Sequence, residues 1–296
     1  SLSEMGELQR TVRQAVIGER LARAGVDPAV LMVATAPVSL ETARVSNGQV
    51  SGETGESSFL LAYVMSFLLY MALLLYGTQV MGSVVEEKSN RIMEVLVSSL
   101  TPCELMLGKV VGVGSVALLQ LGIWSGAAKL LTSQRVAIAG LFGAAPSDAI
   151  GMPIPAISGS LLVVYLTFFV LGFFLYSAAY AAVAATVSTQ QEAQQAAMPV
   201  TLCIVAGLLL MFGLLDEPNG TLARTMSLIP LFAPFVTPVR HSLSPLPLTE
   251  LLASAGMTAL GVVLVAWVAG RIYRVGILMY GKRATIPEIF RWIRTG

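Results

Sequence analysis

Long apolar runs alternate with short polar segments along most of this chain. A helix rises about 1.5 Å per residue, so about 20 apolar residues cross a bilayer core of about 30 Å. The pattern predicts a transmembrane domain at 58–271 whose fourth helix is kinked at Pro199. Five runs in this domain are long enough to span a membrane, at about 59–82, 105–128, 157–187, 196–215 and 250–271.

The composition agrees with this pattern. The 296 residues are 55% hydrophobic and only 12% charged, whereas a soluble domain carries roughly 25% charged residues. The formal net charge of +1 gives no reason to expect a nucleic-acid partner. We therefore expect an all-α integral membrane protein with five transmembrane helices in a lipid bilayer.

Residues 1–57 are the only long segment with the composition of a soluble domain. Apolar residues first recur at helical spacing, and a strand-like alternation at 38–42 then precedes the turn sequence Asn47-Gly48. A segment of this length buries little core alone, so we predict a partial extracytoplasmic α/β domain. Because the chain starts at Ser1 without a methionine or signal-peptide pattern, we expect an N-terminal segment to be missing.

A charged segment at 84–99 separates the first two runs. On a helical wheel, Glu87, Arg91 and Glu94 share one face opposite an apolar face, and their spacings of four and three residues allow ion pairs. The pattern predicts an amphipathic helix at the membrane surface. The alternative is a solvated loop helix with no partner.

Two polar turns have the sequence of a helix start. Thr101, followed by a proline and then by Glu104, predicts a capping box for the second run. Ser188 or Thr189 can cap the helix that leads into the fourth run, with Gln191 or Glu192 completing the box. Glu192 can also contact a partner or line a pathway, and the alternative is a solvated loop carboxylate.

An apolar segment at 225–239 carries three prolines, four residues apart, at Pro230, Pro234 and Pro238. Proline removes a backbone donor and clashes with the preceding turn, so this segment is not a regular spanning helix. We predict a re-entrant or interfacial element, because irregular backbone at membrane depth needs shelter from lipid. An ordinary extracytoplasmic loop is the alternative.

Charge near the spans predicts which side faces the cytoplasm. Lysine and arginine are more frequent beside the spans at 83–109 and in the basic tail at 272–296 than in the segments on the other side. Positive residues favour the cytoplasmic side. We therefore place the C-terminus and the 84–99 segment in the cytoplasm.

Enzyme chemistry finds little support in the sequence. Glu86-Glu87-x-x-x-Arg91 matches the EExxxR motif of the intramembrane prenyl-protease-like family, but that chemistry needs histidines, and this chain has one, His241. Cys103 and Cys203 show no metal-ligand spacing. The chain has no catalytic motif, no metal or cofactor site and no phosphate-binding loop, so a partner would have to bind any ATP.

Two stretches resemble a known family. The sequence VVEEKSNRIMEVL at 84–96, followed by Leu107-Gly108-Lys109, resembles the ABC-2 type exporter permeases, in particular the sodium-efflux permease subfamily. The sequence RIYRVGILMYGKR at 271–283 is similar to that family's C-terminal end. The family has six spans, with a large extracytoplasmic domain after the first, so the resemblance implies that this chain lacks the first span and most of that domain.

The resemblance implies a function as well as a fold. We expect a permease subunit in a prokaryotic cell membrane that dimerises and exports ions or small amphiphilic molecules. A separate cytoplasmic ATPase would bind ATP and Mg. The alternatives are a non-transport sensor or assembly subunit and, third, an intramembrane hydrolase, which needs a second histidine or a metal.

Site residues are also carried over from the family. The segment 84–99 corresponds to the part that docks into the ATPase, and 225–239 to the re-entrant outer segment. From the polar turn itself, and not from the family, we expect a second cytoplasmic contact at Gln191 and Glu192. We expect an outer gate at Pro230, Pro234 and Pro238, and ATPase docking at Glu86, Glu87, Lys88, Arg91 and Glu94.

Overall fold

The computed structural model describes most of the predicted transmembrane domain. The described residues are 43–46, 49–93, 99–134, 159–215, 217–277, 279 and 286–295. The helical and strand-like patterns predicted within 1–42 lie outside these residues, and so does Glu94.

The described chain begins with a small hairpin. Strands β1 (Ala43–Ser46) and β2 (Gln49–Thr54) pair antiparallel, with Ser46 opposite Gln49. The predicted turn sequence at 47–48 connects them. A two-stranded hairpin cannot bury a core of its own, so the described residues give no support to a partial α/β domain.

Helices long and apolar enough to cross a membrane make up most of the described chain. Four qualify singly, and a bent pair of helices can supply a fifth span. Each overlaps one of the five predicted runs. They are α3 (Gly55–Ser89), α5 (Pro102–Ser133), α8 (Gly159–Ala185), α10 (Met198–Leu214, bent against α9) and α13 (Leu248–Gly276).

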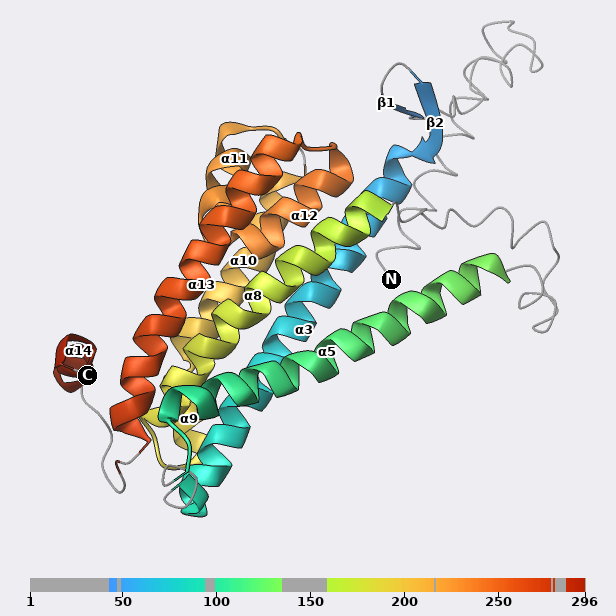
Figure 1. Ribbon diagram of the computed structural model, residues 1–296. Coiled ribbons are helices and arrows are strands. Elements are labelled where there is room, and N and C mark those ends of the chain that lie inside the picture. Colours follow the sequence, from blue (N-terminus) through green and yellow to red (C-terminus); the bar gives the residue numbers. More distant parts are fainter. Residues whose placement is uncertain are drawn as a thin grey trace, which may run out of the picture. The chain divides into compact units, whose positions relative to one another are not determined.

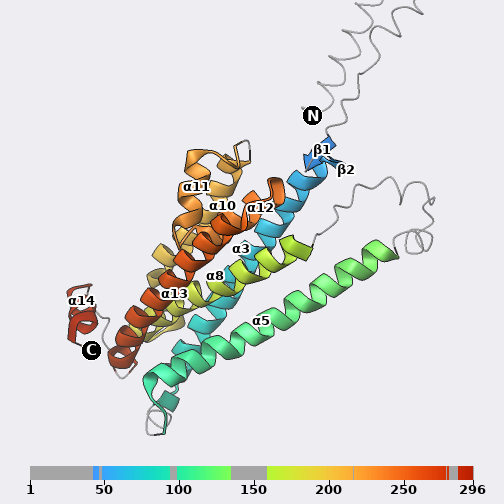
Figure 2. The same cartoon turned by 45° about the horizontal axis from the view of Figure 1, so that its top comes forward.

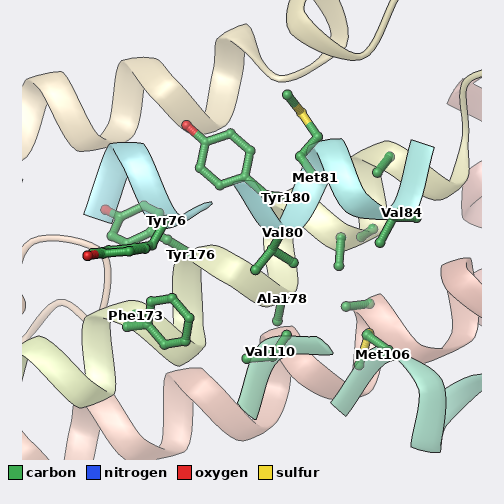
Figure 3. Close-up of a cluster of buried hydrophobic side chains, with 14 of the residues drawn as sticks. Tyr76, Val80, Met81, Val84, Met106, Val110, Phe173, Tyr176, Ala178 and Tyr180 are labelled. Atoms are coloured by element: carbon green, nitrogen blue, oxygen red, sulfur yellow. The ribbon is translucent and has the colours of Figure 1, made fainter. Parts of the chain in front are cut away.

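Helix α8 is the centre of the packing. It lies along both α3 and α13 (Figure 1). Alanines on its C-terminal half are buried, among them Ala181 and Ala184, and small side chains let neighbouring helices approach closely. In Figure 3, aromatic and aliphatic side chains from α3, α5 and α8 interdigitate around Val80 and Tyr180.

Helix α5 packs on the core from its start to Leu121. Both Figure 1 and Figure 2 show its C-terminal half diverging from the other described helices. Met106 and Val110 are buried in the core, whereas Leu119 and Ile123 are exposed. The capping box predicted at its start is confirmed: Glu104 N donates to the Thr101 side chain, and the Glu104 carboxylate accepts from Thr101 N.

The predicted kink in the fourth span is also confirmed. Helix α9 (Gln190–Ala196) and α10 meet at an angle of 49°. The break is at Ala197, two residues before Pro199 in the first turn of α10. Pro199 has no N–H to donate to the carbonyl four residues earlier, so the helix changes direction there.

Two further segments contain shorter helices. The region of 225–239 is a helix–turn–helix of α11 (Thr221–Leu228) and α12 (Ala233–Leu243), with Pro238 inside α12. Part of the basic tail is a helix, α14 (Ile286–Thr295). Its Trp292 is buried in the main core cluster.

The charged segment at 84–99 is not one amphipathic helix. Helix α3 continues without a break to Ser89, and the chain then turns at Arg91, whose φ of 56° lies in the left-handed region. Residues 94–98 lie outside the described residues. The positive φ ends the α-helix because a right-handed helix requires negative φ at every residue.

Candidate functional site

The charged end of α3 sends consecutive side chains in different directions. Glu86 is exposed, and so is Arg91 beyond the helix. Glu87 is half-buried and forms an ion pair with Lys109 of α5, rather than with Arg91 as predicted. The left-handed turn removes the helical geometry that would have placed Glu87 and Arg91 on one face.

Lys88 is enclosed in the protein. Its side chain is 1% exposed. The Nζ atom donates to the carbonyl oxygen of Ala185 at 2.6 Å and to that of Gly276 at 2.7 Å. The Glu192 carboxylate also acts on this ammonium electrostatically. Lys88 therefore offers no surface to a partner in this structure, although the sequence placed it in the docking set.

Helix α9 lies beside the last turns of α3. Gln190 packs so closely on Gly82 that a methyl group there would lie 3.0 Å from its side-chain nitrogen. Thr189 caps α9 by accepting from Glu192 N at 3.3 Å, and the Glu192 carboxylate accepts from Ser188 N at 3.2 Å. Gln191 is exposed and Glu192 half-buried. Two polar segments about 100 residues apart in sequence thus form one surface.

The three prolines of 225–239 pack on the middle of α13 and of α8 and beside the first half of α3. Pro230, in the turn before α12, fills the space above Gly261 of α13, and Pro234 packs on Gly172 of α8. Pro238 lines a narrow cavity between α3, α8 and α12 together with Tyr165. The segment is inserted among the long helices rather than exposed as a loop.

A buried arginine, which no sequence pattern predicted as a site residue, connects the parts of this segment by hydrogen bonds. Arg240 of α12 is 1% exposed. Its guanidinium donates to Pro218 O at 2.7 Å, to Ser227 Oγ at 2.8 Å and to the Glu250 carboxylate of α13 at 3.0 Å. Arg240 and Glu250 are only ten residues apart, but no helical spacing relates them. Their pairing depends on how α12 turns back onto α13.

The arrangement offers no recognisable catalytic centre. His241 lies in the last turn of α12, where its Nδ1 accepts from Leu246 N at 3.1 Å. Within the described residues, no cluster of three or more histidine, cysteine, aspartate or glutamate side chains could hold a metal ion. The polar groups instead join the ends of helices.

The fold defines a multi-pass membrane protein built from packed apolar helices. Comparison with known proteins then gives the family: residues 3–271 match the family described as ABC-2 family transporter protein. The chain therefore belongs to the ABC-2 transporter family, as its membrane component.

Two uncharacterized relatives are similar over most of the chain. The Bacillus subtilis protein YhaP is 30% identical over 290 residues, which cover 97% of this chain and 68% of the relative. The Methanocaldococcus jannaschii protein MJ1024 is 28% identical over 258 residues, which cover 87% of this chain and 59% of the relative. No solved structure matches.

Proposed function

We propose that this chain is the membrane-spanning permease subunit of an ATP-driven exporter, with ATP and Mg bound by a separate ABC ATPase subunit. The chain moves ions or small amphiphilic molecules out of a prokaryotic cell and works with a second permease copy. The family match supports a transport role.

One observation carries the proposal. Helix α9 lies beside the end of α3, and Glu86, Arg91 and Gln191 of these two segments are all exposed. These exposed polar residues lie where apolar spans end, and such a surface fits a soluble partner better than it fits lipid. We assign this surface, together with Glu87 and Glu192, to the cytoplasmic ATPase, and Glu94, which lies outside the described residues, keeps the docking role that the resemblance implies. Lys88 is left out because it is buried.

The proline-containing segment 225–239 has a complementary role in this proposal. Pro230, Pro234 and Pro238 seat α11 and α12 among α3, α8 and α13. A rigid plug that reaches the middle of α8 and α13 from the outer side would close an export path until the spans move apart. We assign it as the outer gate, on the extracytoplasmic side.

Co-purification with the ATPase encoded beside this protein tests the docking surface. The double variant Glu86→Lys/Arg91→Glu reverses two exposed charges and should lose most of the captured ATPase, because it opposes the partner's complementary charges. The control Glu217→Lys/Arg224→Glu reverses two exposed charges near α11 and should capture as much ATPase as wild type.

Equal capture by both double variants would remove the ATPase from this surface. No capture by wild type would instead support a non-transport membrane subunit.

A further inference from the structure

Lys88 of α3 connects this helix to the C-terminal ends of α8 and α13. Ala185 and Gly276, whose carbonyls accept from Lys88 Nζ, are the last residues of α8 and α13. The last four carbonyls of a helix lack partners within the helix and carry partial negative charge. One ammonium on α3 therefore caps both helices at once.

The ends of α8 and α13 are in direct contact at this point. A methyl group at Gly276 would lie 2.7 Å from the Ala185 carbonyl oxygen, closer than real side chains approach a backbone atom. Glycine thus lets the two carbonyls converge on one donor. The two ends and Lys88 form one unit, which we name the Lys88 junction (Lys88, Ala185 and Gly276).

The surroundings of the junction compensate the buried charge of Lys88. Burying an ammonium is unfavourable unless it is hydrogen-bonded and compensated by opposite charge. Two carbonyls supply the hydrogen bonds, and Glu192 supplies the opposite charge. Nearby, one Glu87 carboxylate oxygen and the Tyr273 hydroxyl are buried without a hydrogen-bond partner among the described residues.

Lys88 also lies next to the surface assigned to the ATPase. Glu86 is exposed and Lys88 is buried, two positions apart in the last turns of a continuous helix. A displacement of the exposed end of α3 must move Lys88 with it, because a helix turn is held by its own hydrogen bonds. The junction then passes that displacement to α8 and α13.

We propose that Lys88 is a positioning residue that couples movement at the ATPase-facing end of α3 to α8 and α13. This inference rests on the proposed function, since it assumes that the ATPase binds at 86–91. Without the ammonium, α3 would still bind the ATPase, but the ends of α8 and α13 would no longer follow it.

Hydrogen exchange of the purified protein, with and without its ATPase, tests the coupling. In wild type, ATPase binding should slow amide exchange at 84–93 and also at the two other helix ends, 181–187 and 272–277. In Lys88→Met, which keeps the side-chain volume, slowing at 84–93 should remain and slowing at the other two ends should be lost. A purely structural role would speed exchange at those ends whether or not the ATPase is bound.

The control Arg274→Met removes an exposed positive charge from the last turn of α13, and it should behave as wild type. If Lys88→Met does not fold, Lys88→Gln, whose amide keeps a donor without the charge, serves the same comparison. Slowing at all three segments in the Lys88 variant would overturn the proposal, and so would slowing confined to 84–93 in wild type. Absence of ATPase capture by wild type would instead remove the proposed function itself.

Discussion

Glycines, which have no side chain beyond a hydrogen, decide where the helix–turn–helix of α11 and α12 docks. Three glycines on three different helices each face a ring from this segment: Gly172 faces Pro234, Gly207 faces Phe235 and Gly261 faces Pro230. Rings of proline and phenylalanine are rigid and cannot retract as a flexible side chain can. Each glycine therefore acts as a socket, and any larger residue there would push the segment outward.

We predict that Gly261→Ala destabilises the protein by about 1–3 kcal/mol, the usual range for overpacking a filled site. The added methyl would overlap the Pro230 ring. The matched control is Gly256→Ala on the same helix, where no atom lies within 4 Å of the new methyl. It should be neutral or stabilising by up to about 1 kcal/mol, because alanine favours helix. Unfolding in detergent measures both changes. Equal effects of the two variants would show that Gly261 is not needed to accommodate the Pro230 ring.

Helices α11, α12 and α13 are held together by one polar network. Besides the bonds of Arg240, the Thr237 and Ser254 hydroxyls are 2.8 Å apart, and Ser254 Oγ donates to Ser227 O. All the members named here except Glu250 are buried or nearly so. Satisfied buried networks specify one arrangement of their helices, and partly broken ones are unfavourable.

Arg240→Met should therefore lower the free energy of unfolding by about 2–3 kcal/mol, because Pro218 O and Ser227 Oγ lose their charged donor. Glu250→Gln should have a smaller effect, because the Glu250 side chain is 36% exposed and water can replace part of its interaction. Thermal unfolding in detergent gives both values. The control Glu217→Gln, at an exposed position in the same region, should leave the midpoint of thermal unfolding unchanged. If Glu217→Gln lowered the stability as much as Arg240→Met, the effect would reflect a general sensitivity to charge and not the buried network.

The helices themselves could be predicted from the sequence because their signals are local. Long apolar runs mark the spans, Thr101 with Glu104 marks a helix start, and Pro199 marks a bend. Each signal acts over a few residues, within one turn or one run. The end of α3 could not be predicted as well, since the left-handed residue of the turn is Arg91 and not the neighbouring Asn90, the residue type that tolerates this conformation better.

The partners of the charged residues could not be predicted in the same way. Lys88 bonds carbonyls 97 and 188 positions away in sequence, and backbone carbonyls are present at every residue. Glu87 has a helical neighbour of opposite charge at Arg91, yet pairs across to Lys109. Helix packing determines which partner each charged side chain contacts, and hydropathy alone does not predict that packing.

At the scale of the molecule, the charged residues that the structure describes lie near the ends of the spans or between them. The end of α3 and the start of α5 lie at one side of the bundle, and α11 lies at the other (Figure 1). Our assignment places the first side in the cytoplasm. Cys103, at the start of α5, is exposed and reports on that side.

A membrane-impermeant thiol reagent tests this orientation in a background without Cys203. In intact cells the reagent should leave Cys103 unmodified, and it should modify a cysteine at Arg224→Cys on exposed α11 when Cys103 is also replaced. In inverted membrane vesicles the pattern should reverse, because the bilayer then shields the opposite side. Modification of Cys103 in intact cells would place the C-terminus outside.

Confinement of charge to the helix ends has an electrical consequence. Moving one elementary charge through the whole membrane field changes the free energy by about 2.3 kcal/mol per 100 mV. The apolar stretches of α3, α8 and α10 contain no Asp, Glu, Lys or Arg, so rearranging them carries little charge across that field. We therefore expect the helix movements of the cycle to proceed at the same rate whatever the membrane voltage, leaving the cargo's own charge as the main source of voltage dependence.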